Sequence, residues 1–385
     1  MTHSLQHIAI FTAVGVCSVS CNNDVPSMES NLTSIAETSI SNMVQDVYET
    51  VHTGTRAENN SYRIKSIDTQ VYQIPDSLLI TGTRGIDEKS YEIHTLTLDF
   101  GDTEGFTILS DTPGIEHVFY YTESGCIADT AKNDALKEMV EGTQLLALDI
   151  LINGYGKESI TRGSIDIEPL VPFQWHQGYP FNFYSTYCEC SSCNSKFLRK
   201  HRPIGCVPIA VGQVIATVKK FTGTFYGNRD IDFDNLTKDG YILNDAEALP
   251  VAHFLEEVAL NCQVKIRCDK SGTSAEAAAR YLRDLGYLVD QKTEELDVDR
   301  FIRYLSRGVP QIAHGNNSSA GHSWILDGIK ELNGSYLYHI NWGQGVNHCD
   351  GWSSAYYYGT AHFDKEQEYK FYQYNKNKGF LYITL

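Results

Sequence analysis

Positive charge is scarce in this sequence. Its 385 residues contain 31 Lys and Arg against 48 Asp and Glu, which gives a formal net charge of −17. No run of like charge concentrates the excess, and no internal repeat is apparent. An acidic balance of this kind disfavours nucleic acid and acidic membrane surfaces as partners and mainly keeps a protein soluble. At this length the chain can bury a substantial core, and we expect two domains.

Long hydrophobic runs are also lacking. The most apolar stretch, from Ile8 to Val19, is too short to span a bilayer and resembles the core of a signal peptide over residues 1–21. The Lys or Arg that usually precedes such a core is absent. "SVSC" before "NND" resembles a degenerate bacterial lipoprotein cleavage site with a lipid-bearing Cys21, and the alternative is an ordinary signal peptide cut near Ser20. We therefore expect an exported protein, extracellular, periplasmic or on the outer surface, which a lipid on Cys21 would attach to a membrane.

The first part of the chain, residues 22–160, is expected to form a small α+β unit. "HTLTLDF" alternates apolar and polar residues with the two-residue period of a strand that has one solvated face. "GFTILSD" and "HVFYYTES" follow after turns that contain Gly or Pro, so the three segments predict an antiparallel meander. Helices are expected around residues 34–52 and over 129–153.

The stretch 154–169 is polar, contains glycine and has no periodicity, so we expect an exposed linker that is open to cleavage at Lys157 and Arg162. Beyond it, over residues 161–385, helical segments come first and strand-like segments last. Without alternation of strands and helices, this order predicts an α+β domain rather than a doubly wound sheet. The helical segments lie near 206–218, 246–260 and 274–285, and the strands are "HSWILDGI", "YLYHINW" and "KGFLYITL".

Residues 203–216, "PIGCVPIAVGQVIA", are the most informative segment. Proline lacks an N–H and clashes with the preceding turn, so a helix accepts Pro208 only in its first turn. The helix therefore begins at Gly205–Val207, and Cys206 lies where unpaired N–H groups and the helix dipole favour an anion. This position predicts a lowered thiol pKa and a nucleophilic thiolate, with Gly205 leaving room for a substrate backbone. The alternative is a buried cysteine that acts as a small apolar residue.

A nucleophilic cysteine needs a base that takes up its proton and later delivers it to the leaving group, and histidine is the usual one. In "SSAGHSWILDGI", small residues leave space in front of His322 and the apolar strand after it fixes the backbone. His314 in "QIAHGN" is expected to face solvent or a strand neighbour. His339 in "YLYHINW" is expected to be a hydrogen-bonded structural histidine. We therefore take His322 as the candidate base.

Two further elements would complete such a site. "HINWGQG" offers Asn341 and Trp342 at a strand end, an amide that could orient the histidine ring and an indole that could shield it. The alternative is a strand that ends in a tight turn with a core tryptophan. Acyl transfer also needs donors for an oxyanion, and the backbone N–H of Cys206 can be one. Gln174 or Gln177 of "QWHQGYPFN" can be the other, and the residues alone do not choose between them.

Ten cysteines in an exported chain predict disulfides as well as chemistry. "CECSSCNSKFLRKH" brings three of them close together in sequence, as metal ligands would be, but export favours disulfides here. The connectivity stays open among Cys126, Cys188, Cys190, Cys193, Cys262, Cys268 and Cys349.

Five segments, taken together and in order, carry a family resemblance. "WHQGYPFN", "GCVPIAVGQV", "SGTSAEAAARYL", "AGHSWILDG" and "HINWGQGVNHCDGW" resemble the streptopain-type cysteine peptidases of bacteria, a papain-like family, across about residues 170–385. Residues 90–152, notably "GFTILSD" and "VFYYTESG", are similar to that family's inhibitory propeptide. The resemblance implies a papain-like domain, with the cysteine in its helical N-terminal part and the histidine in its antiparallel β C-terminal part. A small α+β propeptide precedes this domain and covers the site until it is cut.

By position, the resemblance implies that Cys206 is the nucleophile, His322 the general base and acid, and Gln177 the oxyanion-hole side chain. Trp342, with Asn341 beside it, matches the tryptophan that packs near the histidine. Such an enzyme acts on protein or peptide substrates, is inhibited by its own propeptide, and requires no metal and no organic cofactor. The implied substrate-binding positions are Gly205, Ser271, Gly272 and Gly321.

Two departures from the family pattern bear on the site. Pro208, Ile209 and Ala210 stand where the family usually has Ala-Thr-Ala, a change that the first helical turn tolerates. Gln344 replaces the second tryptophan of the family's Trp-Gly-Trp-Gly and opens part of the substrate cleft. The alternatives to a peptidase are therefore a catalytically silent homologue that binds peptides or proteins, and a Cys/His cell-wall hydrolase.

Overall fold

The computed structural model describes residues 29–53, 62–74, 89–128, 134–153, 165–219, 245–268, 270–292, 296–316, 321–345, 349–354, 361–363, 369–371 and 376–385. The predicted signal peptide over residues 1–21 and most of the predicted linker, residues 154–164, lie outside these ranges. Within them, none of the helices combines the length and the apolar character that a membrane crossing requires.

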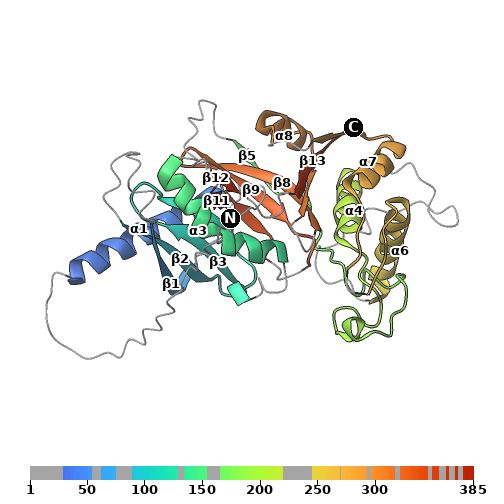
Figure 1. The fold of residues 1–385 in the computed structure, drawn as a ribbon, viewed down its shortest axis with the longest axis horizontal. Helices are drawn as coiled ribbons and strands as arrows, with labels where there is room; N and C mark the ends of the chain where they lie inside the picture. The colour runs from blue at the N-terminus through green and yellow to red at the C-terminus, as the bar shows by residue number, and fades with distance from the viewer. Residues whose placement is uncertain are drawn as a thin grey trace, which may run out of the picture.

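A single eleven-stranded sheet runs through the middle of the molecule (Figure 1). Its strand order is β1-β2-β3-β4-β10-β9-β8-β7-β13-β6, with β5 paired to β8, and β11 and β12 form a separate two-stranded sheet. The strands are β1 (Arg63–Gln73), β2 (Ser90–Asp99), β3 (Glu104–Ser110), β4 (His117–Thr122), β5 (Asp166–Ile167), β6 (Leu288–Lys292), β7 (Gln311–Asn316), β8 (Gly321–Leu332), β9 (Ser335–Asn341), β10 (Gly351–Ser353), β11 (Ala361–Phe363), β12 (Tyr369–Phe371) and β13 (Lys376–Thr384).

The helices cover both faces of this sheet. Trp324 and Leu326 of β8 pack in one core with α3 and α8, whereas Ile325 packs in another core with α4, α6 and α7. Helix α1 packs on β2, β3 and β4 in a third core. The helices are α1 (Glu29–Val51), α3 (Asp134–Asn153), α4 (Cys206–Val218), α6 (Asp245–Asn261), α7 (Ala275–Asp284) and α8 (Val298–Leu305), with a short 3₁₀ helix η2 (Ser191–Asn194).

This architecture confirms the predicted α+β class, the meander and the order of helices before strands. Two features differ from the expectations. The sequence of β1 is exposed at most positions on both faces, so it carries no alternation from which a strand could be predicted. The end of the predicted linker is not an exposed loop, because Asp166 and Ile167 form β5 and pair with Lys330 and Ile329 of β8.

The N-terminal unit joins the C-terminal sheet edge to edge. Strand β4 pairs with β10 through Tyr121 opposite Trp352 and Tyr120 opposite Ser353. The approach is close at Gly351, where an added Cβ would lie 2.5 Å from the carbonyl oxygen of Tyr121. The edge of β10 is therefore covered by the N-terminal unit.

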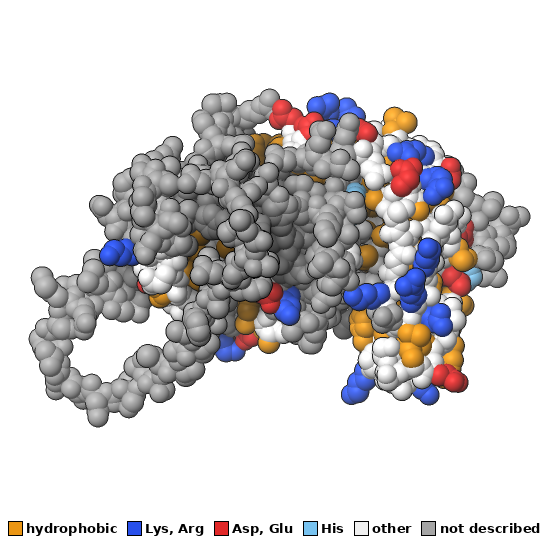
Figure 2. All heavy atoms as spheres, in the orientation of Figure 1, with side chains coloured by type: hydrophobic (Ala, Val, Ile, Leu, Met, Phe, Trp, Pro, Cys, Tyr) orange, Lys and Arg blue, Asp and Glu red, His pale blue; other side chains and the backbone are white. Residues whose placement is uncertain are grey.

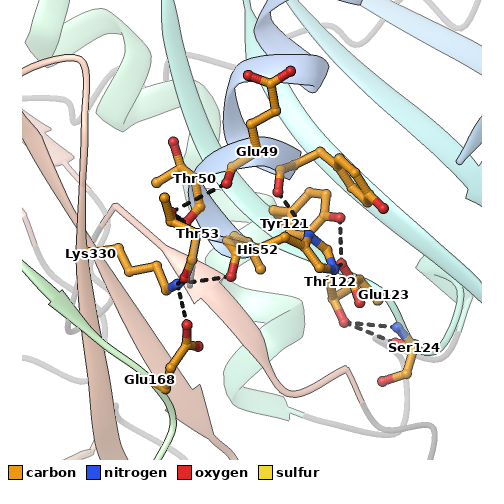
Figure 3. A network of polar contacts seen from close by, with 12 residues as sticks. Glu49, Thr50, His52, Thr53, Tyr121, Thr122, Glu123, Ser124, Glu168 and Lys330 are labelled. Carbon is orange, nitrogen blue, oxygen red and sulfur yellow. Dashed lines mark hydrogen bonds and ion pairs between the residues drawn. The ribbon is translucent and has the colours of Figure 1, made fainter. Parts of the chain in front are cut away.

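A second contact between the two units centres on Lys330 of β8, whose side chain is only 1% exposed (Figure 3). Its Nζ donates to the carbonyl oxygens of Val51 at 2.9 Å and Thr53 at 3.4 Å, at the end of α1. It also contacts Glu168 at 2.6 Å and Asp166 at 3.0 Å. Helix α1 has no basic residue in its last turn, so Lys330 supplies the positive charge that a helix C-terminus favours.

We predict that Lys330→Met destabilises the full chain by about 2–3 kcal/mol. Removing one partner of a buried ion pair costs ~3–5 kcal/mol, and the half-exposed carboxylates of Asp166 and Glu168 reduce this cost. Lys65→Met is the matched control, because Lys65 contacts Glu104 at the same 2.6 Å but with side chains 56% and 39% exposed. Urea unfolding should show a loss of at most ~1 kcal/mol for the control. Equal losses in the two variants would contradict the anchoring role of Lys330.

Candidate active site

Helix α4 begins at Cys206, where Pro208 predicts it to begin, and Pro208 is its third residue. The preceding Gly205 has φ 101° and ψ 152°, a backbone conformation that residues with a side chain rarely adopt. A Cβ at this position would also lie 3.2 Å from the carbonyl oxygen of Ser271. Gly205 and Ser271, predicted from separate segments, therefore lie together beside the candidate nucleophile.

The predicted lowering of the Cys206 pKa is wrong for this form of the protein. Burial raises the pKa of the thiol and outweighs the hydrogen bonds that favour the thiolate. Those bonds come from the backbone and hydroxyl of Ser323 and from the N–H groups of Cys206 and Val207 at the helix N-terminus. The helix end thus acts in the expected direction, but desolvation is the larger effect.

The position of Ser323 shows how close β8 comes to the thiol. Ser323 directly follows the candidate base in sequence, and both lie at the start of β8. The fold therefore brings the segment of His322 next to the N-terminus of α4, although His322 lies 116 positions after Cys206 in the sequence.

The imidazole of His322, however, lies on the other face of the strand. Successive side chains of a β-strand point to opposite faces, so Ser323 and His322 cannot both face α4 while β8 is regular. The His322 ring stacks with Trp324 at 6.1 Å and with Trp342 at 6.3 Å, and both tryptophans belong to the core with α3 and α8. Cys206 packs instead against the core with α4, α6 and α7.

Trp342 connects this histidine to the N-terminal unit. Nε2 of His322 is hydrogen-bonded to the carbonyl oxygen of Trp342 at 3.1 Å. The indole Nε1 of Trp342 donates to the hydroxyl of Tyr120 on β4 at 3.2 Å, and that hydroxyl donates to the carbonyl oxygen of Cys349. The backbone N–H of Trp342 donates to Asp350 Oδ1 at 2.7 Å. Trp342 is thus hydrogen-bonded both to Tyr120 of the N-terminal unit and to the ring of His322.

The side-chain amide of Asn341 joins the end of β9 to α4 and to the segment of Phe173. Its Nδ2 donates to the carbonyl oxygen of Phe173 at 3.0 Å, while its Oδ1 accepts from Gln213 of α4 at 3.1 Å and from the N–H of Gly343 at 3.0 Å. These bonds commit the amide to the junction of α4 and β9, and the His322 ring is bound by the backbone of Trp342 instead. In this form the orientation of the ring by Asn341 remains a prediction.

Gln177 lies beside the start of α4. Its carbonyl oxygen accepts from the N–H of Ile204, two residues before Cys206, at 3.0 Å. The neighbouring His176 forms an isolated bridge with Gln344, and a Cβ on Gly345 would lie 2.6 Å from the His176 ring. The loop after β9 therefore packs beside the predicted oxyanion-hole segment.

The remaining predicted substrate positions lie on two sides of this region. Gly272 pairs with Lys265 in an isolated bridge next to Ser271, and no atom lies within 4 Å of an added Cβ there. Gly321 is exposed at the start of β8, directly before His322, and pairs with Asn316.

The other two histidines behave as structural residues. His339 is confirmed as hydrogen-bonded, with its Nδ1 2.6 Å from Oδ1 of the fully buried Asp327. His314 pairs with Ser323 across β7 and β8, and therefore faces a strand neighbour rather than solvent. Burial lowers the pKa of His314 to about 4, so its ring is neutral near pH 7.

Sequence reasoning missed three residues that act here: Ser323, Tyr120 and Asp350. Ser323 stands next to the candidate histidine, so strand periodicity could have assigned it to the thiol's side. Nothing in the sequence around the other two signals their approach to Trp342, since each comes from a segment that meets it only in the folded chain.

A cysteine at a helix N-terminus, a histidine at the start of an antiparallel strand and a preceding unit docked on the sheet are the features of a papain-like fold with a zymogen-like N-terminal unit. Residues 175–357 match the Peptidase C10 family, so the chain carries a Peptidase C10 domain, and the predicted streptopain-type resemblance is confirmed. A solved fragment of prointerpain A from Prevotella intermedia is similar in structure, with a TM-score of 0.54 and 18% identity, over 82% of this chain and 98% of that one. This likeness shows the fold. No curated protein sequence matches the chain.

We predict that Asp350→Asn flattens the pH dependence of stability. Burial raises the pKa of Asp350 to about 7 from an ordinary 3.8, although the Trp342 N–H opposes the shift. The folded state therefore binds more protons than the unfolded state between about pH 4 and 7, and the free energy of unfolding falls as the pH rises through this window.

The measurement is the urea midpoint of the full chain at pH 5 and pH 8. Asparagine keeps an oxygen for the Trp342 N–H but cannot ionise, so the variant should lose ~1–2 kcal/mol less than the parent over this range, a figure that allows for the partial exposure of Asp350. Asp102→Asn, which removes an exposed carboxylate of the N-terminal unit, serves as the control. An unchanged pH profile in Asp350→Asn would refute the assignment.

Proposed function

We propose that this chain is an exported cysteine endopeptidase, made as a zymogen, that hydrolyses peptide bonds in proteins. Cys206 attacks the substrate carbonyl and His322 protonates the leaving amine. Water activated by the same histidine then hydrolyses the thioester. The N–H of Cys206 and the side chain of Gln177 hold the oxyanion. The observation that carries the proposal is the packing of Cys206, at the N-terminus of α4, against the core that contains Ile325 of β8, the strand that starts beside His322.

In this proposal, activation moves the ring of His322 from one face of β8 to the other. The described form is latent because the imidazole lies on the side of Trp324 and Trp342, away from the thiol. Cleavage between the units, within residues 154–164, would release the N-terminal unit together with the Tyr120 hydroxyl that holds Trp342. The start of β8 can then rearrange so that His322 reaches Cys206. A thiolate–imidazolium pair, rather than the helix dipole alone, would lower the pKa of Cys206.

Two other functions remain as alternatives. A silent homologue would use the same cleft to bind peptides, and the replacement at Gln344 favours it. A cell-wall hydrolase would share the nucleophile and base, but a peptidase-type propeptide docked by β4 and Lys330 favours the peptidase.

The decisive test compares the full chain with Cys206→Ala. In reducing buffer the parent should lose its N-terminal unit, cleave casein and be labelled on Cys206 by a thiol-directed epoxide. Cys206→Ala should do none of these. A parent freed of its N-terminal unit that neither cleaves casein nor takes the label would be a binding protein, and cleavage of peptidoglycan without casein would indicate a cell-wall hydrolase.

The oxyanion role separates the two glutamines. We predict that Gln177→Ala lowers kcat of the processed enzyme ~10²–10³-fold, the usual cost of removing one oxyanion donor, with a small change in KM. Gln174→Ala is the matched control, because it removes a half-buried glutamine three positions away in the same segment, and it should keep kcat within a few-fold. Steady-state hydrolysis of a peptide substrate measures both. Equal losses would exclude Gln177 from the oxyanion site.

A further inference from the structure

Four cysteines outside the active site form one cluster. Cys188, Cys190 and Cys193 come from the segment around η2, and Cys268 comes from the segment that follows α6. Their four sulfur atoms all lie within 4.8 Å of one another. Cys188 and Cys193 are joined as a disulfide. The sulfur of Cys188 nevertheless lies 3.0 Å from that of Cys268, and the sulfur of Cys190 lies 3.5 Å from that of Cys193.

These distances do not describe two separate bridges. A contact of 3.0 Å between the unbonded sulfurs of Cys188 and Cys268 is shorter than the ~3.5–4.0 Å at which even the smaller carbon atoms pack best. Cys188 thus has two close sulfur neighbours, and so does Cys193. Such sharing is typical of four ligands that converge on one point.

The backbone holds this arrangement in place. The N–H of Cys188 donates to the carbonyl oxygen of Lys200 at 2.8 Å. The N–H of Lys200 donates to the carbonyl oxygen of Cys193, also at 2.8 Å. The N–H of Cys193 donates to the carbonyl oxygen of Cys190 at 3.1 Å, which closes the turn of η2. Cys188 and Cys193 are buried, while Cys190 and Cys268 are partly exposed and leave an entry for an ion.

The surroundings of the cluster favour negatively charged sulfur. The overall charge of the chain is −17, yet the two segments that supply the cysteines are rich in basic residues, and Figure 2 shows Lys and Arg gathered over the half of the molecule that carries α4, α6 and α7. The basic residues of the two segments are Lys196, Arg199, Lys200, Arg202, Lys265, Arg267 and Lys270.

We propose that the reduced form of this cluster binds one Zn²⁺ through the thiolates of Cys188, Cys190, Cys193 and Cys268. Zinc with four cysteines is tetrahedral with Zn–S bonds of about 2.3 Å, which places the sulfurs about 3.8 Å apart, within the spread of the cluster. Cys190 and Cys193 have the two-residue spacing of many zinc ligands.

The chemistry balances as follows. A thiol reductant gives two electrons and two protons to the Cys188–Cys193 disulfide and is itself oxidised to a disulfide. Four thiols then bind one Zn²⁺ and release their protons, and the complex carries two negative charges that the neighbouring Lys and Arg offset. The reducing conditions that keep Cys206 a thiol also create the zinc ligands.

Metal binding at this cluster would affect the proposed substrate cleft. Cys268 stands three positions before Ser271, whose carbonyl oxygen lies 3.2 Å from the space beside Gly205. Arg202 also joins the two segments, donating from Nη1 to the carbonyl oxygen of Ile266 at 3.2 Å. A zinc ion would therefore fix the segment of Ser271 against the start of α4, a structural role that holds whether or not the cleft is catalytic.

The test uses the full chain with Cys206→Ala, so that self-cleavage does not interfere. The protein is reduced with a phosphine without oxygen, incubated with Zn²⁺, desalted and analysed for bound zinc. We expect about one zinc per chain, and at least a tenfold lower content in both Cys190→Ser and Cys268→Ser. Cys262→Ala and Cys126→Ser, which remove cysteines outside the cluster, should keep the metal.

A second measurement does not depend on how the variants fold. Cobalt added to the reduced parent chain should give the absorption of tetrahedral Co²⁺ with thiolate ligands, and one equivalent of Zn²⁺ should remove it. The proposal is overturned if the reduced parent retains no more zinc than Cys268→Ser, or if cobalt gives only the spectrum of the hydrated ion. It is also overturned if the four cysteines stay in two disulfides after the other cysteines are fully reduced. Mass spectrometry would then show a chain four hydrogens lighter than the fully reduced one.

Discussion

The alternation of side chains along β8 is the constraint on which the site depends. Ile325 of β8 lies in the core against which Cys206 packs, so His322 points to the opposite face of the strand, where its ring stacks with Trp324 and Trp342. The candidate nucleophile, Cys206 on α4, and the candidate base, His322 on β8, thus lie on different sides of the sheet. Under the proposed function, the latent form needs no blocked cleft, because a regular β8 keeps the ring of the candidate base away from the thiol.

The N-terminal unit stabilises that regular strand from two directions. Lys330 ties the far end of β8 to the C-terminus of α1, and the pairing of β4 with β10 brings Tyr120 to the indole of Trp342. Asp350 accepts from the N–H of the same tryptophan, and its pKa, raised to about 7, makes this junction sensitive to pH. The contacts that we propose to inhibit the site therefore also stabilise the fold, through the one sheet that runs through both units.

Local rules predicted the parts of the site that local geometry determines. Pro208 located the start of α4. Gly205 was expected to leave room for a substrate backbone, and the backbone that approaches it in the structure is that of Ser271. Strand periodicity found β2, β3, β4, β8 and β9. The same rules failed where burial decides, as for the pKa of Cys206, or where distant segments meet. The approach of Cys268 to Cys188 and the capping of α1 by Lys330 join residues that no sequence period relates.

The pH dependence of Cys206 alkylation, followed by mass spectrometry of its peptide, tests the separation of thiol and imidazole most directly. The intact chain should react with a midpoint above that of an ordinary thiol, and His322→Ala should leave this midpoint unchanged. After removal of the N-terminal unit, the midpoint should fall well below it in the parent but not in His322→Ala. A midpoint that is the same before and after removal, or that depends on His322 in the intact chain, would contradict the account.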